Sequence, residues 1–210
     1  MISKIKQKVF KFFKKKIKKN INLGGNEKFN SDYSCLGLTS EFNYDITKNL
    51  SVENNSIEFI WSERVLEHIM CDDLYNVFLN IKKILKTKSK ARFCLPSCFY
   101  NNDNSIDMMR SGNAEKQKKL GHVTFFTYEG YGPILDNHFG TSNPPNPKVY
   151  FKELFSELGF QFKLLRYHNK EKKVIFDKAF LSNENSNHFI DRQEIIINRT
   201  NSLIFDIIKN

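Results

Sequence analysis

Short apolar runs alternate along the chain with segments in which apolar residues recur every three or four positions. The runs predict a strand and its turn at Asn20–Gly25, and further strands at Ser34–Thr39, Ile57–Trp61, Ala91–Pro96, Phe160–Tyr167 and Arg199–Ile208. The helical spacing predicts helices at Asp72–Leu85, Thr127–Phe139 and Lys148–Leu158, with Gly159 ending the last one. This alternation predicts one α/β domain over residues 20–210 with a mainly parallel sheet.

The first 19 residues follow a different pattern. Apolar residues recur there at spacings of three and four, nine lysines fill most other positions, and no acid is present. The pattern predicts a basic amphipathic helix, for which two interpretations stay open: it lies on an anionic membrane surface, or it packs its apolar side on the domain. No signal-peptide apolar core or cleavage site follows, which favours a cytoplasmic protein, peripheral on the inner membrane face under the first interpretation.

The positive charge of the chain belongs to this segment. The net charge is +10, but outside residues 1–19 there are 24 basic and 23 acidic residues, so the domain is nearly neutral. A nucleic-acid-binding domain usually spreads basic residues over its fold, and the sequence therefore predicts no nucleic-acid partner.

The four cysteines, Cys35, Cys71, Cys94 and Cys98, include no C-x-x-C pair, and no histidine stands near them at zinc-ligand spacing. We therefore expect no metal. Cys94 lies in an apolar run, which predicts a buried thiol.

Polar residues and glycines follow the predicted strands, where ligands bind in parallel α/β sheets. Gly24 and Gly25 follow the first strand, and Asp45 precedes a short polar connection to the next buried strand. After Ile57–Trp61 comes Ser62–His68 (SERVLEH), then the amphipathic helix and a strand that ends in Leu-Pro-Ser.

This order resembles the class I S-adenosylmethionine-dependent methyltransferases, especially a small type-11-like group often encoded with polysaccharide biosynthesis. The resemblance covers about residues 20–209 and includes the Gly121-His122 pair, Gly159-Phe160 and the ending Ser202–Lys209. Three family features differ here. The first turn lacks its second spaced glycine, no acid stands at the end of the second strand, and Lys86-Thr87-Lys88 replaces a Pro-Gly-Gly turn.

The resemblance implies a Rossmann-like methyltransferase sheet flanked by helices, S-adenosylmethionine as cofactor, and a glycan or other small molecule as methyl acceptor. It implies cofactor contacts from Asn22, Gly24, Gly25, Asn26, Thr39, Asp45, Ile46 and Ser62. Candidate catalytic residues are His122, His68 and Glu63.

Each candidate also has a structural interpretation. Asp45 could cap a turn with Thr47, Ser62 could be a helix N-cap, and both histidines could be structural. Two other functions stay open: a binding or scaffold module that keeps the fold without the cofactor, and a nicotinamide-dependent dehydrogenase. The latter would need a fuller glycine-rich turn.

Overall fold

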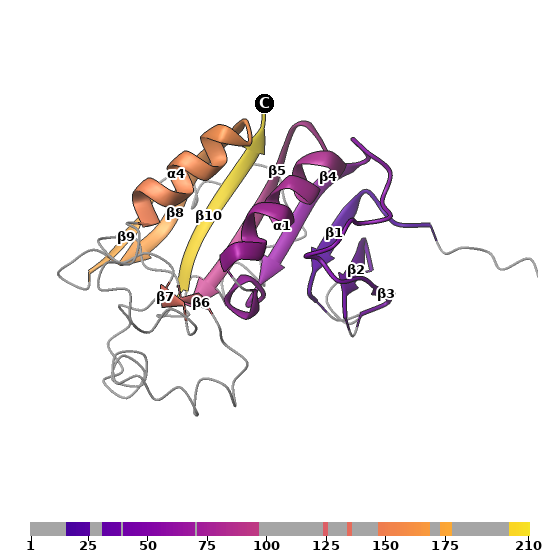
Figure 1. Ribbon diagram of the computed structural model, residues 1–210, viewed down its shortest axis with the longest axis horizontal. Coiled ribbons are helices and arrows are strands. Elements are labelled where there is room, and N and C mark those ends of the chain that lie inside the picture. Colours follow the sequence, from indigo (N-terminus) through magenta and orange to yellow (C-terminus); the bar gives the residue numbers. More distant parts are fainter. Residues whose placement is uncertain are drawn as a thin grey trace, which may run out of the picture.

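The computed structural model describes residues 16–25, 31–38, 40–69, 71–96, 124–125, 134–135, 147–168, 173–177 and 202–210 (Figure 1). Two α-helices, a 3-10 turn and ten strands lie in these ranges. The helical elements are η1 (Leu66–His68), α1 (Cys71–Ile84) and α4 (Pro147–Glu157). The strands are β1 (Asn20–Leu23), β2 (Tyr33–Gly37), β3 (Phe42–Asn43), β4 (Ile57–Glu63), β5 (Leu85–Pro96), β6 (Thr124–Phe125), β7 (Ile134–Leu135), β8 (Phe160–His168), β9 (Val174–Phe176) and β10 (Ser202–Lys209).

Eight strands form one twisted sheet in the order β3-β2-β1-β4-β5-β10-β8-β9. The five strands from β3 to β5 are parallel, as the alternation of elements predicts. The remaining pairs are antiparallel, because β10 enters between β5 and β8 and runs against both. The sheet is therefore mixed, with a parallel half and an antiparallel half. Its strand order and flanking helices give the Rossmann-like class I methyltransferase fold that the sequence predicts.

The connections in the parallel half are short. Residues 24–32 join β1 to β2, and residues 38–41 join β2 to β3. Parallel strands usually need a crossover of about a dozen residues or more, most often containing a helix. The first two connections are shorter than that, and the parallel pairing of β1 with β2 puts the carboxyl ends of these strands side by side.

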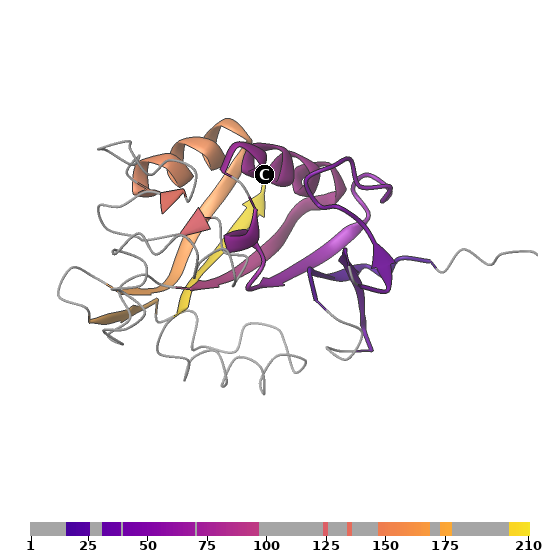
Figure 2. The ribbon, with the colours of Figure 1, turned by 60° about the horizontal axis from the view of Figure 1, so that its bottom comes forward.

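Both α-helices cover the same face of the sheet (Figures 1 and 2). On that face the main core joins α1 and α4 to the strands through stacked and edge-to-face phenylalanines. Phe78 of α1 contacts Phe155 of α4 edge to face, with ring centroids 4.8 Å apart. Phe93 of β5 stacks on Phe205 of β10 at 5.1 Å. Aromatic pairs of this kind add to the stabilisation from apolar burial.

The opposite face carries a smaller apolar cluster and a buried ion pair. The cluster contains Tyr33, Trp61, Cys94, Leu165 and Ile204. Cys94 is buried, as its apolar run predicts. Beside the cluster, the guanidinium of Arg92 donates two hydrogen bonds to the carboxylate of Asp206, at 2.7 and 2.9 Å. This bidentate pair joins β5 to β10 across the boundary between the parallel and antiparallel halves.

Hydrogen bonds from neighbouring residues cap the carboxyl-terminal end of α1. The amide of Asn55 donates to the Lys83 carbonyl, and the amide of Ser56 donates to the Ile84 carbonyl, both at 2.9 Å. The ammonium of Lys209, near the end of β10, donates to the carbonyls of Lys82 and Leu85, both at 2.7 Å. Carbonyls that a helix end leaves without intrahelical partners are thus hydrogen-bonded.

Several sequence predictions are confirmed, most of them with small shifts in their bounds. The exception is β5, which begins at Leu85 rather than at Ala91 and includes Lys86-Thr87-Lys88. The predicted strands correspond to β1, β2, β4, β5, β8 and β10, and two predicted helices to α1 and α4. Gly159 adopts a φ of 70°, the left-handed conformation that commonly ends a helix. The sequence missed β3, and it missed β9, a short apolar run between Lys173 and Asp177.

The predicted helix Thr127–Phe139 is wrong where the structure describes it, because Ile134–Leu135 form β7 and pair with β6. Gly130, Gly132 and Pro133 interrupt the apolar spacing there, and both residue types disfavour helix.

The amino-terminal helix prediction is also wrong at its end, since residues 16–19 are not helical. The Lys18 amide donates to Ser34 Oγ at 2.9 Å, and the Lys19 carbonyl accepts from the Glu58 amide at 2.7 Å. The backbone of Lys18 and Lys19 is therefore hydrogen-bonded to residues of the sheet. Ile17 packs against the main core. Residues 1–15 lie outside the described ranges. Within those ranges no helix combines the length and apolar character needed to cross a membrane.

Candidate functional site

The carboxyl ends of the five parallel strands lie at one edge of the sheet, which we call the carboxyl edge. Gly24 and Gly25 directly follow β1, and Asp45 follows β3 after one residue. Ser62 and Glu63 are the last two residues of β4 rather than the first residues beyond it. Ser62 is aligned with Leu23 across the β1–β4 ladder, so it lies beside the glycine turn. The edge therefore gathers the residues that the sequence selected around β1, β3 and β4.

The glycine turn is closely packed by the protein's own side chains. Gly24 has a φ of 76°, which L residues rarely adopt. A Cβ atom on Gly24 would lie 2.4 Å from Cγ2 of Val65. A Cβ atom on Gly25 would lie 1.6 Å from Nδ2 of Asn22, whose amide covers that residue. Both glycines are thus needed for close approach, here to Val65 and Asn22.

The end of β2 explains why no acid stands there. A Cβ atom on Gly37 would be 3.0 Å from Cα of Gly24 and 2.9 Å from Oγ of Ser40. The Ser40 hydroxyl also donates to the Gly25 carbonyl. The turn after β2 is therefore fastened to the turn after β1, and this position leaves little room for a carboxylate side chain.

Asp45 forms a local turn and retains one unused oxygen. Its Oδ1 accepts from the Thr47 amide at 3.0 Å and from the Thr47 hydroxyl at 2.7 Å. These hydrogen bonds, the hydroxyl one foremost, lower the pKa of Asp45 from its ordinary value. The sequence predicted, as the structural interpretation of Asp45, that it caps a turn with Thr47, and this turn is present. Oδ2 has no hydrogen-bond partner in the described part of the chain, and the residue is exposed.

Two polar side chains near the end of β4 are buried without partners. Ser62 and Glu67 are each 1% exposed, and neither the Ser62 hydroxyl nor either Glu67 oxygen has a hydrogen-bond partner within the described ranges. Burial raises the pKa of the Glu67 carboxyl to about 7. A buried polar group without a partner is uncommon in a folded protein and often marks a functional region.

No specific role for Glu67 was predicted from the sequence. The signal was present, because the acid lies in the segment Val65–Ile69, where three of the five residues are apolar, after a buried strand. A charged residue in such a stretch is either paired or held close to neutrality.

Some of the remaining candidates have a described position, and the others lie outside the described residues. Glu63 ends β4 and His68 lies in η1, where its amide donates to the Val65 carbonyl at 2.9 Å. Ser62 is not a helix N-cap, because the N-cap position of η1 is Val65 and has no side-chain capping bond. Ile46 is buried in the main core. Asn26, Thr39 and His122 lie outside the described residues.

The site has groups suited to the adenine and the amino-acid portion of S-adenosylmethionine, but it lacks an acid for the ribose. Asp45 presents an exposed carboxylate oxygen that can accept a hydrogen bond from an adenine amino group. The Asn22 amide over Gly25 has a donor and an acceptor for the amino-acid portion. At the end of β2, Gly37 supplies no carboxylate for a ribose diol. No cluster of three or more possible metal ligands occurs in the ranges that the structure describes.

Comparisons with known proteins give structural similarities only. No family model matches the chain, and no curated protein matches it. The structure is similar to an S-adenosylmethionine-dependent methyltransferase from Archaeoglobus fulgidus, with 14% identity, a TM-score of 0.46, and coverage of 91% of this chain and 85% of that one.

Two further solved structures are similar at the same level. The YcgJ protein of Bacillus subtilis has 10% identity and a TM-score of 0.47, covering 93% of this chain and 92% of that one. Phosphoethanolamine N-methyltransferase 2 of Haemonchus contortus, solved with S-adenosylmethionine, has 13% identity and a TM-score of 0.48, covering 92% of this chain and 49% of that one. At these identities and scores, the strand order of the sheet remains the basis for assigning the fold.

Proposed function

We propose that the protein is an S-adenosylmethionine-dependent methyltransferase whose cofactor binds at the carboxyl edge. The observation that carries this proposal is the position of Asp45, directly beyond β3 with one exposed carboxylate oxygen unused. It lies at the edge where a left-handed glycine turn follows β1. The order of motifs along the chain supports the same assignment independently.

In this proposal, Gly24, Gly25 and Asn22 bind the amino-acid portion of the cofactor, and Asp45 accepts from the adenine amino group. Backbone groups at Ile46 border the adenine, since the Ile46 side chain belongs to the core. Asn26, Thr39 and Ser62 complete the cofactor contacts as the sequence predicts. When bound, the cofactor supplies an electrophilic methyl group, and the task of the protein is to orient an acceptor and exclude water.

The acceptor is proposed to be a glycan or another small molecule bearing a hydroxyl or amine. Glu63, His68 and His122 are the candidate bases for its proton. Glu67 joins them, because its raised pKa is close to neutral and its oxygens have no partner among the described residues. A base with a pKa near the working pH is favourable for proton transfer.

A second candidate function is favoured by the packing of the glycine turn. Val65 and Asn22 fill the space beside Gly24 and Gly25, and Gly37 stands where a ribose-binding acid is expected. A protein of this fold that binds a partner without the cofactor would tolerate all three features. The missing charge-assisted hydrogen bond alone is worth about 1.5–3 kcal/mol.

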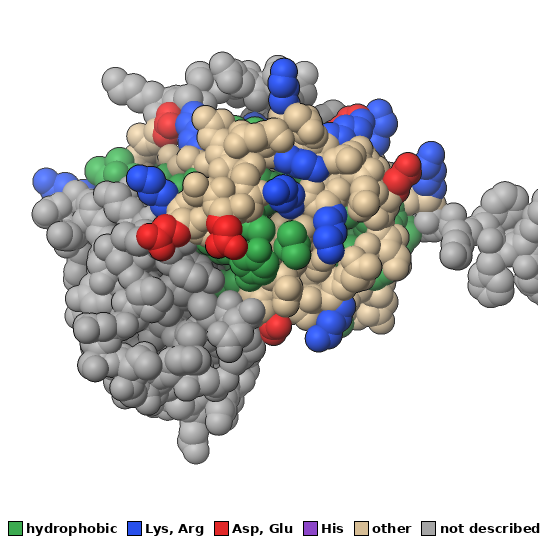
Figure 3. All heavy atoms as spheres, turned by 45° about the horizontal axis from the view of Figure 1, so that its top comes forward, with side chains coloured by type: hydrophobic (Ala, Val, Ile, Leu, Met, Phe, Trp, Pro, Cys, Tyr) green, Lys and Arg blue, Asp and Glu red, His purple; other side chains and the backbone are tan. Residues whose placement is uncertain are grey.

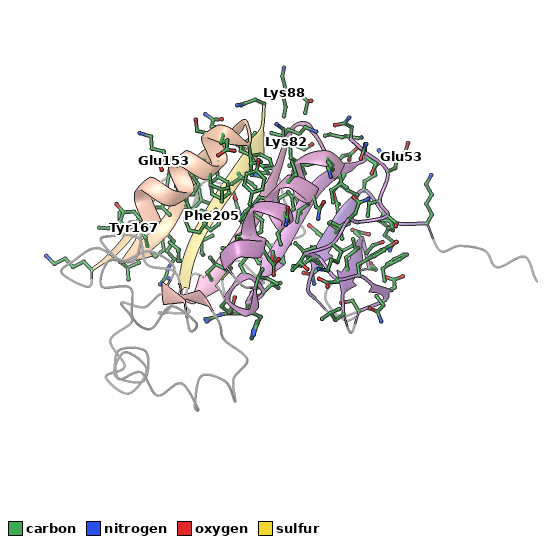
Figure 4. The ribbon with its side chains drawn as sticks, in the orientation of Figure 1. Glu53, Lys82, Lys88, Glu153, Tyr167 and Phe205 are labelled. Atoms are coloured by element: carbon green, nitrogen blue, oxygen red, sulfur yellow. The ribbon has the colours of Figure 1, made fainter. Side chains whose placement is uncertain are left out.

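Calorimetric titration of the full chain separates these functions. We expect weak binding of S-adenosylmethionine, with a dissociation constant above the micromolar range common for substrates, and no binding of NAD. Asp45→Ala should weaken binding by roughly tenfold. Glu53→Gln is the matched control, because this exposed acid belongs to the opposite edge of the sheet (Figure 4). No heat at millimolar S-adenosylmethionine would favour the scaffold function.

A further inference from the structure

Lysines gather at the edge of the sheet opposite the candidate site. We call this the amino edge: the place where β1, β4 and β5 begin and β10 ends. Lys82 and Lys83 lie at the end of α1, Lys86 and Lys88 lie at the start of β5, and Lys19 precedes β1. Figure 4 labels Lys82 and Lys88 at this end of the molecule. Residues 74–102 of the sequence contain no acid to balance them.

Two acids near the starts of β1, β4 and β5, Glu53 and Glu58, are outnumbered by the lysines there. Glu58 is shared by two lysines, with its Oε1 at 2.9 Å from Lys19 Nζ and 2.6 Å from Lys86 Nζ. Within the described residues, Lys82, Lys83 and Lys88 form no ion pair, and Lys83 and Lys88 are exposed. In Figure 3, which brings this end forward, basic side chains are spread over the visible face.

The end of the lysine-rich amino-terminal segment lies at this edge, because Lys19 shares Glu58 with Lys86. Lys16, Lys18 and Lys19 are exposed and lead directly into β1. The preceding residues add six more lysines together with apolar residues at helical spacing. Basic charge on the domain and an amphipathic sequence beside it are the two components of reversible binding to an anionic bilayer.

We propose that the amino edge, through Lys82, Lys83 and Lys88, is a docking surface for an anionic lipid bilayer. The basic residues of the stretch 82–90 are all lysines, which act as point charges suited to a diffuse anionic surface. Nucleic-acid phosphates are more often bound by the bidentate fork of arginine. Docking by this edge turns the carboxyl edge toward the aqueous phase, so the candidate site receives water-soluble acceptors. The proposal does not depend on methyltransferase activity.

The test uses the full chain and vesicles of phosphatidylcholine with 30% phosphatidylglycerol, a composition of roughly physiological surface charge. The variant Lys82→Gln, Lys83→Gln, Lys88→Asn removes three charges, and Asn suits the left-handed φ of 64° at position 88. The control Lys152→Gln, Lys163→Gln, Lys173→Gln removes three charges from α4, from β8 and from the residue before β9, away from the amino edge.

We expect the amino-edge variant to lower vesicle partitioning about 10- to 100-fold, as three lysines near a charged surface imply. The control should change it less than about threefold, and salt should weaken binding of the wild type. Equal losses in both variants, or no loss in the amino-edge variant, would overturn the proposal. A loss of binding to a 20-nucleotide RNA without a loss on vesicles would also overturn it and assign the surface to nucleic acid.

Discussion

The two edges of the sheet differ in how completely their polar groups are satisfied. At the amino edge, Lys209 donates three hydrogen bonds, to Asn55 Oδ1 at 2.6 Å and to the two carbonyls near the end of α1. At the carboxyl edge, the buried Ser62 hydroxyl and Glu67 carboxyl have no partners in the described chain. Both regions belong to the same sheet, with Lys209 at the end of β10 and Ser62 near the end of β4.

We interpret the amino edge as contributing mainly to stability and the carboxyl edge as contributing mainly to function. The hydrogen bonds of Lys209 at the amino edge hold the end of α1 against β5 and β10. Unsatisfied groups at the carboxyl edge destabilise the fold unless something else compensates, and such local conflicts are typical of functional regions. The carboxyl edge is also where ligands bind in parallel α/β sheets. We therefore interpret its unsatisfied groups as belonging to the candidate site.

The largest expected effect comes from removing the amino-edge contacts. Lys209→Met keeps much of the aliphatic chain and removes all three hydrogen bonds, leaving the carbonyls of Lys82 and Leu85 without this donor. We expect a loss of about 2–3 kcal/mol in the free energy of unfolding, measured by urea denaturation. Lys152→Met, at an exposed position on α4, should change it by less than about 0.5 kcal/mol. A similar change in both variants would remove the contrast between the edges.

The carboxyl edge should respond in the opposite direction. The pKa of Glu67 is raised in the folded protein to about 7 from an ordinary value of 4.5, so the fold favours the protonated carboxyl. This contribution to stability is fully present below about pH 4.5 and is lost as the pH rises toward 7.

Glu67→Gln should therefore stabilise the protein by roughly 1–3 kcal/mol at pH 8 and have little effect at pH 4.5. Urea denaturation at the two pH values measures both. The control Glu53→Gln, at an exposed acid, should show no such pH dependence. Destabilisation by Glu67→Gln at pH 8 would mean that the ionised carboxylate has a favourable partner in solution.

The smallest effect concerns the turn at Asp45. Thr47→Val removes the hydroxyl donor and keeps the backbone amide bond, so the pKa of Asp45 should rise toward its ordinary value. We expect a loss of about 0.5–1 kcal/mol in stability at pH 7. The pKa of Asp45 is measurable by NMR titration of its carboxyl carbon. An unchanged pKa would show that the Thr47 hydroxyl does not hold the carboxylate in solution.

The sequence predicted the strand framework well because its strands are short apolar runs with clear ends. It also predicted correctly that the two glycines mark the end of the first strand. It predicted no strand before Asp45, because β3 has only two residues. It could not reveal that Gly25 is covered by Asn22, since the two are close only through the fold of the turn. It also could not separate the parallel from the antiparallel half, because β10 reaches its place between β5 and β8 only after a long intervening segment.

The most direct test of the proposed site is amide hydrogen exchange of the full chain with and without S-adenosylmethionine at millimolar concentration. The account predicts slower exchange at the carboxyl edge, in peptides that cover residues 22–25, 45–47 and 62–68. Residues 82–90 at the amino edge should exchange at the same rate in both samples. Protection confined to the amino edge, or no protection anywhere in a folded protein, would contradict the assignment of cofactor binding to the carboxyl edge.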